Sequence, residues 1–473
     1  MTLATRTPLL SRPEWHRLLQ EHHDVLVIGG GIHGAGVARD AALRGLRVAL
    51  IERGDWASGT SSRSSKLMHG GLRYLRQGSV KLVREALHER ELAKTLAPGW
   101  VHPLTFRIVP PPERPVSPML RAGVLLYGAL GGSMRTSRFW AREPGYEDAM
   151  IDDARFCLCV MLEARRHGAL ALSYVEWLEW VRRGEHLVAA RVRDRFTGEE
   201  GVVSASTFVN ATGPWADLLA GETARRSGAE LRLTRGTHVV LDRRADDIAR
   251  LFFAGEDGRV LFLLPFGAKA SLLGTTDLDE PAPVEEPLAT HTEIQYLRDA
   301  FRTQFPEWKH WRPVGTMCGL RPLLAASGAP SEISREERLL TDGSGNLLSI
   351  LGGKYTTYRS VAERAVNTIE TWLDRVPTEW PTRTEPFPDD ERDENDPVDL
   401  VRRAFTLEDA VRLEDVFLRR TRLAHLNAVD PELLRRAVHL WRLRWGKSEA
   451  EGEEEKDAFL ELQTRGQGPL AYW

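Results

Sequence analysis

The sequence is poor in cysteine, with three residues in a chain of 473. Cys157 and Cys159 lie two positions apart in a segment with helical spacing, where side chains at that separation point in different directions. We therefore expect neither a disulfide framework nor a zinc site, and we predict no bound metal.

Long hydrophobic runs are also missing. The most apolar stretch, residues 119–130, contains Arg121 and is too short to span a bilayer. Residues 1–23 contain Pro8, Pro13, Glu14 and several histidines in place of the charged start and apolar run of a signal peptide. We therefore expect a cytoplasmic protein, and peripheral attachment to the inner face of the cell membrane stays open.

Neither sign of charge dominates, because the formal net charge is -3. A chain without a strong positive field is a poor general partner for nucleic acid, so any anion site must be local. Hydrophobic residues make up 42% and charged residues 28%, which is typical of a soluble globular protein. The length exceeds what one hydrophobic core supports, and this predicts two or three domains.

A βαβ unit is expected near the start of the chain. Residues 24–29 have the pattern of a short buried parallel strand, residues 32–44 show helical spacing of small and apolar residues, and residues 46–52 supply a second strand. Two further apolar strands, at residues 207–210 and 347–351, are each followed by glycine. A strand followed by glycine therefore recurs at three distant places, which fits a discontinuous nucleotide-binding domain.

The segments between these strands have a different pattern. Residues 234–241 and 260–274 are rich in β-formers around a turn at residues 266–269, which predicts an inserted antiparallel sheet. Residues 386–397 are rich in proline and aspartate and indicate a linker, after which helical periodicity continues to the end. The acidic run at residues 449–457 is expected to be a solvated segment.

Residues 29–34, GGGIHG, satisfy the G-x-G-x-x-G fingerprint between a predicted strand and helix, and Glu52 follows at the end of the next strand. Gly29 permits the tight turn, Gly31 lets the backbone approach a pyrophosphate, and Gly34 allows close packing of helix on strand. Glu52 can accept hydrogen bonds from ribose hydroxyls. The pattern predicts a dinucleotide site, but the fingerprint alone does not choose between NAD and FAD.

A second glycine-containing segment follows at residues 59–74, GTSSRSSKLMHGGLRY. Its small hydroxyl residues and backbone N–H groups suit an extended cofactor, and Gly70 and Gly71 would allow contact with a flat ring. On composition alone, the segment also fits a flexible surface loop.

This segment resembles the signature of FAD-dependent glycerol-3-phosphate dehydrogenases, which also carry a glycine fingerprint like residues 29–34. The resemblance covers nearly the whole chain, although His33 stands where the family more often has Asn or Thr, and residues 448–457 and the final segment match nothing in it. Further matches follow in the family's order at residues 210–215 (NATGPW), 235–238 (RGTH), 264–266 (LPF), 274–277 (GTTD), 319–323 (GLRPL), 334–335 (SR), 352–359 (GGKYTTYR) and 418–423 (LRRTRL).

The resemblance implies an α/β fold similar to that of glutathione reductase and D-amino-acid oxidase. It contains a discontinuous Rossmann-like FAD-binding domain, an inserted, mainly antiparallel substrate domain and a C-terminal helical domain. We assign the FAD-binding domain to residues 20–95, 150–220 and 345–385, the substrate domain to residues 96–149 and 221–344, and the helical domain to residues 386–473.

The resemblance also implies which residues contact FAD. The junction at Gly353 and Lys354, before a helical run at residues 358–370, can aim a helix N-terminus and a lysine at the pyrimidine end of the flavin. The implied cofactor residues are Gly29, Gly31, Ile32, His33, Gly34, Glu52, Arg53, Thr60, Ser61, Ser62, Ser65, Lys66, Leu67, His69, Gly70, Val175, Ala211, Gly213, Trp215, Arg321, Gly353, Lys354 and Thr356.

The implied reaction is oxidation of sn-glycerol 3-phosphate to dihydroxyacetone phosphate by hydride transfer to the flavin. Such a reaction needs a phosphate anchor, for which guanidinium groups are well shaped, and a group that takes the hydroxyl proton. The implied substrate residues are Arg73, Tyr74, His238, Arg321, Arg335 and Lys354.

Two histidines in matching motifs are candidate bases, because the ordinary pKa of histidine lies near neutrality. Either His69 or His238 could take the proton, and each could instead be a structural residue. Arg321 is the third candidate catalytic residue, since its charge could stabilise the developing alkoxide.

The electron acceptor is the least determined part. The dehydrogenases that the chain resembles are peripheral membrane enzymes that reduce quinone, whereas related glycerophosphate oxidases use oxygen and carry a large insertion that is not evident here. Quinone is therefore the favoured acceptor. Residues 114–138 mix apolar side chains with Arg121, Arg135 and Arg138, which suits an anionic lipid surface and equally suits core packing.

Several alternatives stay open from the sequence. An amino-acid or hydroxy-acid oxidase of the same flavin fold would need a carboxylate clamp in place of a phosphate site. A flavin-binding scaffold without turnover would bind the cofactor, but no substrate would reduce it. A homodimer also stays open.

Overall fold

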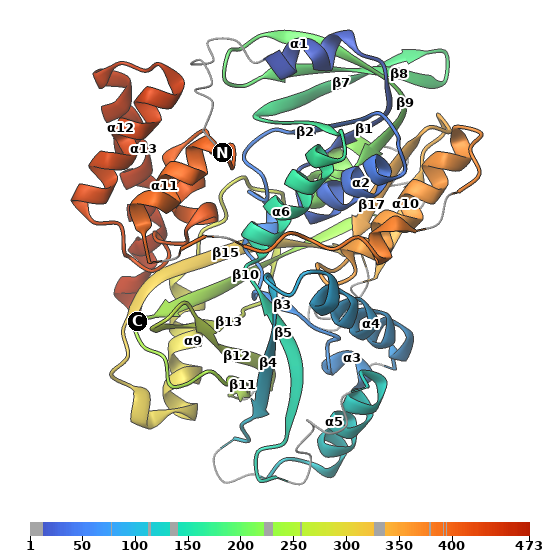
Figure 1. Cartoon of the computed structure of the whole chain (residues 1–473). Helices are drawn as coiled ribbons and strands as arrows, with labels where there is room; N and C mark the ends of the chain where they lie inside the picture. The colour runs from blue at the N-terminus through green and yellow to red at the C-terminus, as the bar shows by residue number, and fades with distance from the viewer. Residues whose placement is uncertain are drawn as a thin grey trace.

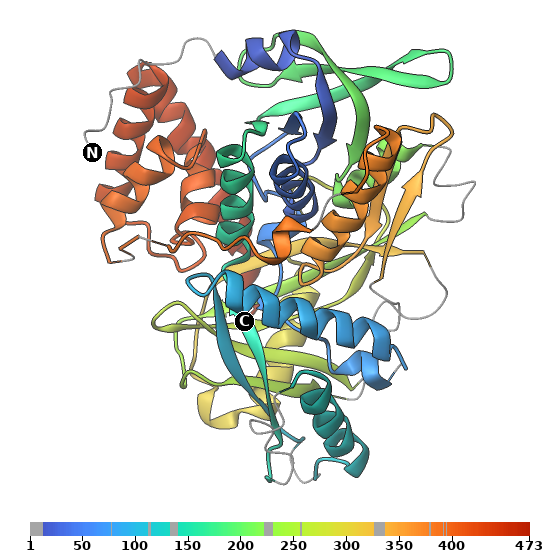
Figure 2. The same ribbon diagram turned by 45° about the vertical axis from the view of Figure 1, so that its right-hand side comes forward.

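The computed structural model describes residues 13–76, 78–111, 115–132, 141–221, 230–255, 258–325, 336–377, 380–390, 392–393 and 395–473. Two large β-sheets lie one above the other in Figure 1, with helices around them and a helical C-terminal unit at one side. Figure 2 shows this C-terminal unit beside helix α6 (Asp153–Arg166) of the upper part.

Eight strands of the described chain form the upper sheet. Strands β6, β2, β1, β9 and β17 pair in parallel in that order, β16 adds an antiparallel edge, and β7 and β8 extend from β9 as an antiparallel ribbon. The strands are β1 (His23–Ile28), β2 (Val48–Glu52), β6 (Leu170–Ser173), β7 (Val175–Arg183), β8 (His186–Asp194), β9 (Glu200–Asn210), β16 (Glu337–Thr341) and β17 (Leu347–Gly352). The strands predicted at residues 24–29, 46–52, 207–210 and 347–351 are confirmed.

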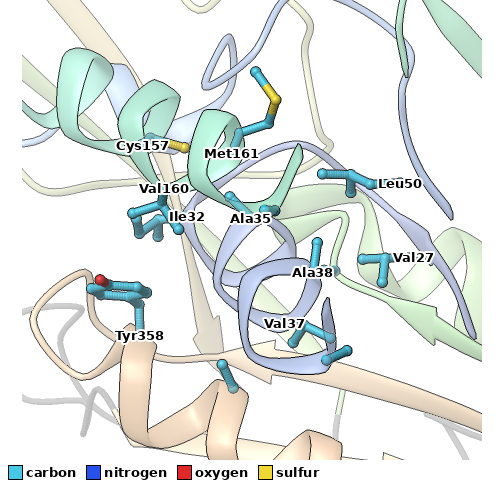
Figure 3. Packing of buried hydrophobic residues seen from close by; sticks show 14 of the residues in the cluster. Val27, Ile32, Ala35, Val37, Ala38, Leu50, Cys157, Val160, Met161 and Tyr358 are labelled. Carbon is cyan, nitrogen blue, oxygen red and sulfur yellow. The ribbon is translucent and has the colours of Figure 1, made fainter. Parts of the chain in front are cut away.

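Small residues let the helices over this sheet approach closely. Helix α2 (Ile32–Leu43) packs on α6 and on α10 (Tyr358–Trp372), and a Cβ added at Gly36 would lie 2.8 Å from the Tyr358 ring. Figure 3 shows Val27, Ala38 and Val160 in the core that these helices share. Helix α1 (Pro13–Gln20) covers the other side of the strands, where Trp15 and Leu18 are buried. The glycine loop therefore sits on a rigid support.

The lower sheet is antiparallel except where β4 pairs with β11, so the predicted inserted antiparallel sheet is confirmed. In the described residues its strands are β3 (Leu67–Met68), β4 (Val101–Ile108), β5 (Gly145–Ile151), β10 (Leu231–Leu241), β11 (Ala249–Ala254), β12 (Arg259–Phe266), β13 (Ala270–Gly274), β14 (Leu278–Glu280) and β15 (Pro313–Leu324). The predicted turn at residues 266–269 joins β12 to β13.

Alternation along β10 supplies both faces of this sheet with core residues. Val239 belongs to the core under α9 (His291–Gln304), and Val240 belongs to the core under α4 (Val80–Leu96) and α5 (Pro118–Leu130). The short helical elements nearby are α3 (Arg73–Arg76), α7 (Ala216–Ala220), η1 (Thr60–Ser62), η2 (Gly213–Trp215), η3 (Pro306–Trp308) and η5 (Pro381–Arg383).

The C-terminal unit has its own core, which includes Phe405, Phe417 and Trp441. Side-chain caps define its helix starts, because Asp430 accepts from the Leu433 N–H and Ser448 forms a capping box. Its elements are α11 (Pro397–Thr406), the π-helical turn η6 (Asp415–Arg420), α12 (Pro431–Trp445), α13 (Glu449–Gln467) and η7 (Gly468–Tyr472). The helical C-terminal part is confirmed, and the described residues between η5 and α11 form no helix or strand.

The acidic run differs from its prediction as a solvated segment. Residues 449–457 form the start of α13, and Glu453 and Glu454 are exposed as expected. Glu455 is buried instead, where it accepts hydrogen bonds from the backbone N–H of Leu413 at 2.8 Å and from Arg412 at 3.1 Å. The prediction was wrong for Glu455, because a glutamate on the inner face of a helix can cap backbone N–H groups of a neighbouring turn.

Two short strands, β3 and β16, do not lie in the sheet of the domain to which their residues were assigned. Strand β3 pairs with β5 in the lower sheet although residues 20–95 were assigned to the cofactor domain, and β16 pairs with β17 in the upper sheet although residues 221–344 were assigned to the substrate domain. The three cysteines are buried free thiols, Cys157 and Cys159 lie on α6, and Cys318 lies on β15.

Candidate active site

A cavity of about 1370 Å³ lies between the two sheets and reaches the C-terminal unit. Its wall combines the glycine loop after β1, the ends of β9 and β17, and strands β10 and β15, so residues far apart in the chain meet there. The predicted site residues that line it are Gly29, Gly31, Ile32, His33, Glu52, Arg53, Thr60, Ser61, Ser65, Leu67, His69, Arg73, Tyr74, Val175, Ala211, Gly213, Trp215, His238, Arg321, Gly353, Lys354 and Thr356.

The glycine loop leaves no room for side chains. Gly29 has a φ of 111°, and a Cβ there would lie 2.5 Å from the carbonyl oxygen of Ala211. A Cβ at Gly34 would lie 1.8 Å from the Gly29 carbonyl oxygen. The N–H of Ile32 donates to Ser61 Oγ at 2.9 Å, which joins the loop to the hydroxyl-rich segment. The loop and that segment therefore form one continuous wall.

Glu52 holds the loop from the other side. Its carboxylate accepts from the Gly30 N–H at 2.6 Å and from the Gly54 N–H at 2.8 Å. Burial raises the pKa of Glu52, and the two N–H groups oppose that rise. Glu52 also lines the cavity, so it remains placed to accept from a ribose hydroxyl.

At the same end of the cavity, a cation lies over an aromatic ring. The Arg53 guanidinium carbon is 4.2 Å from the centre of the Trp215 ring, and Val175 forms the adjoining apolar wall. A flat cation–aromatic pair of this kind can face a purine base.

The hydroxyl-rich segment connects the two sheets. The Thr60 hydroxyl donates to the Leu320 carbonyl of β15 at 2.6 Å. Lys66 points away from the cavity, where its ammonium donates to the Ser62 carbonyl at 2.7 Å and forms a buried ion pair with Asp153. The segment is thus an anchored part of the fold, and the alternative that it forms a flexible surface loop is excluded.

His238 lies on β10, between Met317 of β15 and Gly274 of β13. Its Nε2 is hydrogen-bonded to Ser65 Oγ at 2.9 Å, and its Nδ1 is buried without a hydrogen-bond partner among the described residues. Burial, together with the smaller effects of the Arg321 and Lys66 charges, lowers the pKa of His238 from 6.5 to about 3. The ring is therefore neutral at physiological pH.

Arg321 reaches across the sheet next to His238. Its guanidinium donates to the Thr276 carbonyl and to Asp277, each at 3.0 Å, and to the Thr275 hydroxyl at 2.6 Å. A Cβ at Gly236 would lie 1.9 Å from Arg321 Nη2, so the glycine of the RGTH motif makes room for the guanidinium. The motif thus places its histidine and this arginine together.

Two further cations face one aromatic ring. Lys354 Nζ lies 4.0 Å from the centre of the Tyr74 ring, and the Arg73 guanidinium carbon lies 5.2 Å from it. Lys354 is buried and lies between β17 and α10, after Gly353, whose φ is 96°. A Cβ at Gly353 would lie 2.6 Å from the His33 ring, so this glycine is needed for the close approach of the two loops.

His69 also lines the cavity, in the segment between β3 and α3. Its backbone N–H donates to Thr356 Oγ1 at 3.1 Å, and the Thr356 hydroxyl donates to the His69 carbonyl at 3.3 Å. Both candidate histidines therefore line the cavity, but the charge of Arg321 acts on His238.

The model of the FAD dependent oxidoreductase family matches residues 24–359, well over half of the chain. The chain belongs to this family. It is 40% identical over 377 residues to glycerol-3-phosphate dehydrogenase 2 of Mycobacterium tuberculosis, covering 75% of this chain and 64% of that protein. It is 36% identical over 388 residues to D-erythritol 1-phosphate dehydrogenase of Brucella abortus, covering 77% of each.

This oxidoreductase therefore spans about 64% of the length of the mycobacterial relative. Among solved structures, it is similar to the glycerol-3-phosphate dehydrogenase of Bacillus halodurans complexed with FAD. That likeness has a TM-score of 0.75 and 25% identity, and it covers 96% of this chain and 97% of the other. The flavoprotein fold expected from the sequence is confirmed.

FAD is the cofactor of this family, and the described residues fit it. Gly29 and Gly31 offer backbone without side chains to a pyrophosphate, and Ser61 and Glu52 offer polar groups beside it. The same cavity, of about 1370 Å³, is also lined by Lys354, so one continuous space joins the loop to this lysine.

Four predicted cofactor residues do not line the cavity: Gly34, Ser62, Lys66 and Gly70. Gly34 serves the packing of α2 on β1, and Lys66 is paired with Asp153. Arg335, a predicted substrate residue, lies outside the described residues.

Sequence reasoning missed the support of the Gly70 and Gly71 turn. Tyr127 Oη accepts from the N–H groups of Gly70 at 2.7 Å and Gly71 at 3.2 Å, and it donates to Asp148. Burial raises the pKa of Asp148 to about 6. No spacing signal could reveal this contact, since Tyr127 lies on α5, 57 residues beyond Gly70.

The apolar arm of the cavity was also missed. It lies beside α5 and strands β11 and β12, and each of its residues separately looks like ordinary core. Its residues are Leu72, Leu120, Leu251, Phe253, Val260 and Phe262. No group of three or more metal-ligating side chains occurs in the part of the chain that the structure describes.

Proposed function

We propose that this FAD dependent oxidoreductase oxidises sn-glycerol 3-phosphate to dihydroxyacetone phosphate. The observation that carries the proposal is a neutral, buried histidine, His238, beside Arg321 in a cavity that Lys354 and Arg73 also line. Bound FAD supplies the acceptor for the hydride that leaves carbon 2 of the alcohol.

The cations supply the anchor. A phosphate carries two negative charges near neutral pH, whereas a carboxylate carries one, and three basic side chains in one cavity match the larger charge. The Arg321 guanidinium is fixed by Thr275 and Asp277, so it can hold phosphate oxygens without losing much side-chain freedom on binding. This favours a phosphorylated alcohol over an amino acid or a hydroxy acid.

The hydrogen-bonded pair of Ser65 and His238 supplies the proton acceptor. As the hydride leaves, the hydroxyl proton passes to this pair, and the carbon–oxygen bond becomes a carbonyl. The pKa of His238 is lowered to about 3 chiefly by burial, and a phosphate bound at Arg321 would offset only the smaller effect of that positive charge.

Anaerobic mixing of the FAD-loaded protein with sn-glycerol 3-phosphate tests the proposal. We expect the flavin absorption to bleach with this substrate and to stay unchanged with glycine, sarcosine or 2-hydroxy acids. D-Erythritol 1-phosphate tests the related four-carbon substrate. Bleaching by an amino acid or a hydroxy acid, but by neither of the two phosphorylated alcohols, would overturn the proposal. Bleaching by none of these compounds would favour a flavin-binding scaffold without turnover.

We further propose that electrons leave to a quinone. The apolar arm beside α5 supports this, because a quinone ring needs an apolar approach to the flavin and oxygen does not. A soluble short-chain quinone is expected to restore the flavin colour much faster than air-saturated buffer. Equal rates would favour an oxidase.

Peripheral attachment to a membrane surface remains a proposal that rests on α5. Met119 is 67% exposed and Leu126 45% exposed, while Val124 and Tyr127 pack inward. Arg135 and Arg138 of the same predicted surface lie outside the described residues, as does residue 114. No described helix has the length and apolar character needed to cross a bilayer. Binding to anionic vesicles at low salt, weakened by Met119→Glu, is the expected result.

A further inference from the structure

The C-terminal unit makes a buried contact with the loop that follows β2. Asp55 in that loop is fully buried, and Arg420 forms two hydrogen bonds to its carboxylate, at 2.6 and 2.7 Å. Arg419 adds a third at 2.5 Å. Two consecutive arginines of η6 therefore hold one carboxylate of the FAD-binding part.

The same two arginines are fixed within their own unit. Arg419 also pairs with Asp415 at 2.5 Å, and Tyr174 donates to Asp415 at 2.9 Å. Arg420 donates to the Glu408 carbonyl at 2.9 Å. A π-helical turn is uncommon and often marks a functional position, and here it carries both arginines that contact Asp55.

A short path leads from Asp55 to the glycine loop. The next residue, Trp56, packs under Gly30, where an added Cβ would lie 2.5 Å from the indole ring. Ala57 donates its N–H to the Gly30 carbonyl at 3.0 Å. On the other side of Asp55, Gly54 donates to Glu52, which itself accepts from Gly30. The position of Asp55 therefore bears directly on the loop that faces FAD.

We propose that Arg420 is a positioning residue for FAD, which acts through Asp55 on the glycine loop. Arg419 shares Asp55 with it and also lines the cavity. The C-terminal unit is then part of the cofactor site, although neither arginine belongs to the fingerprint. This goes beyond the oxidation of a phosphorylated alcohol, since it applies whatever the substrate is.

The charges agree with this role. Burial alone would raise the pKa of Asp55, but Arg420 and Arg419 outweigh it and hold that pKa below its usual value, so the carboxylate stays charged. Removal of either arginine leaves a buried charge with too little compensation, and the loop must move toward water to relieve it. Movement of residues 55–57 displaces Gly30.

The test is the dissociation constant of FAD for Arg420→Gln and for Arg420→Lys, measured by quenching of flavin fluorescence on purified apoprotein. We expect Arg420→Gln to weaken FAD binding about tenfold or more. Loss of a residue that orients the direct contacts of a ligand commonly has an effect of this size. Arg420→Lys keeps the charge but cannot make the two-pronged contact, so a smaller weakening is expected.

Arg155→Gln is the matched control. Arg155 pairs with Glu408 at 2.6 Å in an equally buried contact between α6 and the C-terminal unit, but it does not touch Asp55. We expect this variant to lower the melting temperature while its FAD dissociation constant stays within about twofold of the starting protein. If Arg420→Gln and Arg155→Gln weaken FAD binding equally, the proposal is overturned. It is also overturned if Arg420→Lys and Arg420→Gln both leave FAD binding unchanged.

Discussion

His238 is kept neutral by its surroundings, and this has a consequence for stability. Its pKa is lowered from the ordinary 6.5 to about 3, first by burial and then by Arg321 and Lys66. Between these two values the unfolded chain binds a proton that the folded chain does not. The contribution of the neutral ring to stability is therefore complete above pH 6.5 and is lost as the pH falls below it.

His238→Gln should remove this part of the acid sensitivity. From the linkage relation, a histidine that titrates only in the unfolded chain costs about 2 kcal/mol between pH 7 and pH 5. The loss of melting temperature over that interval should be smaller in the variant. The exposed His310→Gln serves as the control and should melt like the starting protein at both pH values. Equal acid sensitivity in all three proteins would contradict the buried, neutral state.

The sequence could name the residue types of the site, but not their partners. The fingerprint is local, so Gly29, Gly31 and Glu52 were predicted from spacing, and all three line the cavity. Ser65 was predicted as a cofactor residue, but its bond to His238 joins residues 173 positions apart. Such a contact depends on how two sheets meet, and periodicity carries no record of it. The same limit left His69 and His238 equivalent at the outset.

Among the helices, α2 shows how one position can fix an element. It begins after Gly31 and packs on β1 only because Gly34 has no side chain. The predicted helix at residues 32–44 ends within one residue of the observed helix, because its small residues are spaced for burial against neighbours. By contrast, the two-residue strand β3 has too few residues to show any alternation, so its place in the lower sheet could not be predicted.

Gly34→Ala tests whether FAD binding depends on the close approach of α2 to the glycine loop. The new Cβ would lie 1.8 Å from the Gly29 carbonyl oxygen, so α2 and the glycine loop must shift apart. We expect FAD binding to weaken by at least about tenfold. A displacement of about an ångström in a precisely positioned contact commonly has an effect of that size or larger. The measurement is FAD retention after gel filtration, followed by titration.

Gly466→Ala is the matched control for that variant. Gly466 lies inside α13, where an added Cβ would have no atom within 4 Å. Alanine is the better helix former by about 1 kcal/mol, so the control should keep FAD and melt at the same or a higher temperature. Weak FAD binding in the control as well would mean that glycine replacement, and not the position of α2, is responsible.

At the scale of the whole molecule, the cofactor cavity touches all three parts that the sequence predicted. The glycine loop belongs to the upper sheet, His238 to the lower sheet, and Arg412 and Arg465 of the C-terminal unit also line the wall. The general division into these parts followed from composition and pattern. Their mutual contacts did not, since surface arginines and contact arginines look alike in a sequence with so many of them.

Removal of FAD should therefore loosen segments that are distant along the chain but adjacent in space. Free FAD at about 100 times its dissociation constant stabilises the folded protein by about 2.7 kcal/mol through mass action, so the melting temperature should rise on reconstitution. Hydrogen exchange should slow together at residues 29–34, 60–65 and 352–356, because each lines the cavity. The outer face of α12 should exchange equally in both states. Protection confined to the first βαβ unit would mean that FAD is held by the upper sheet alone, and the three parts would then not be coupled through the cofactor.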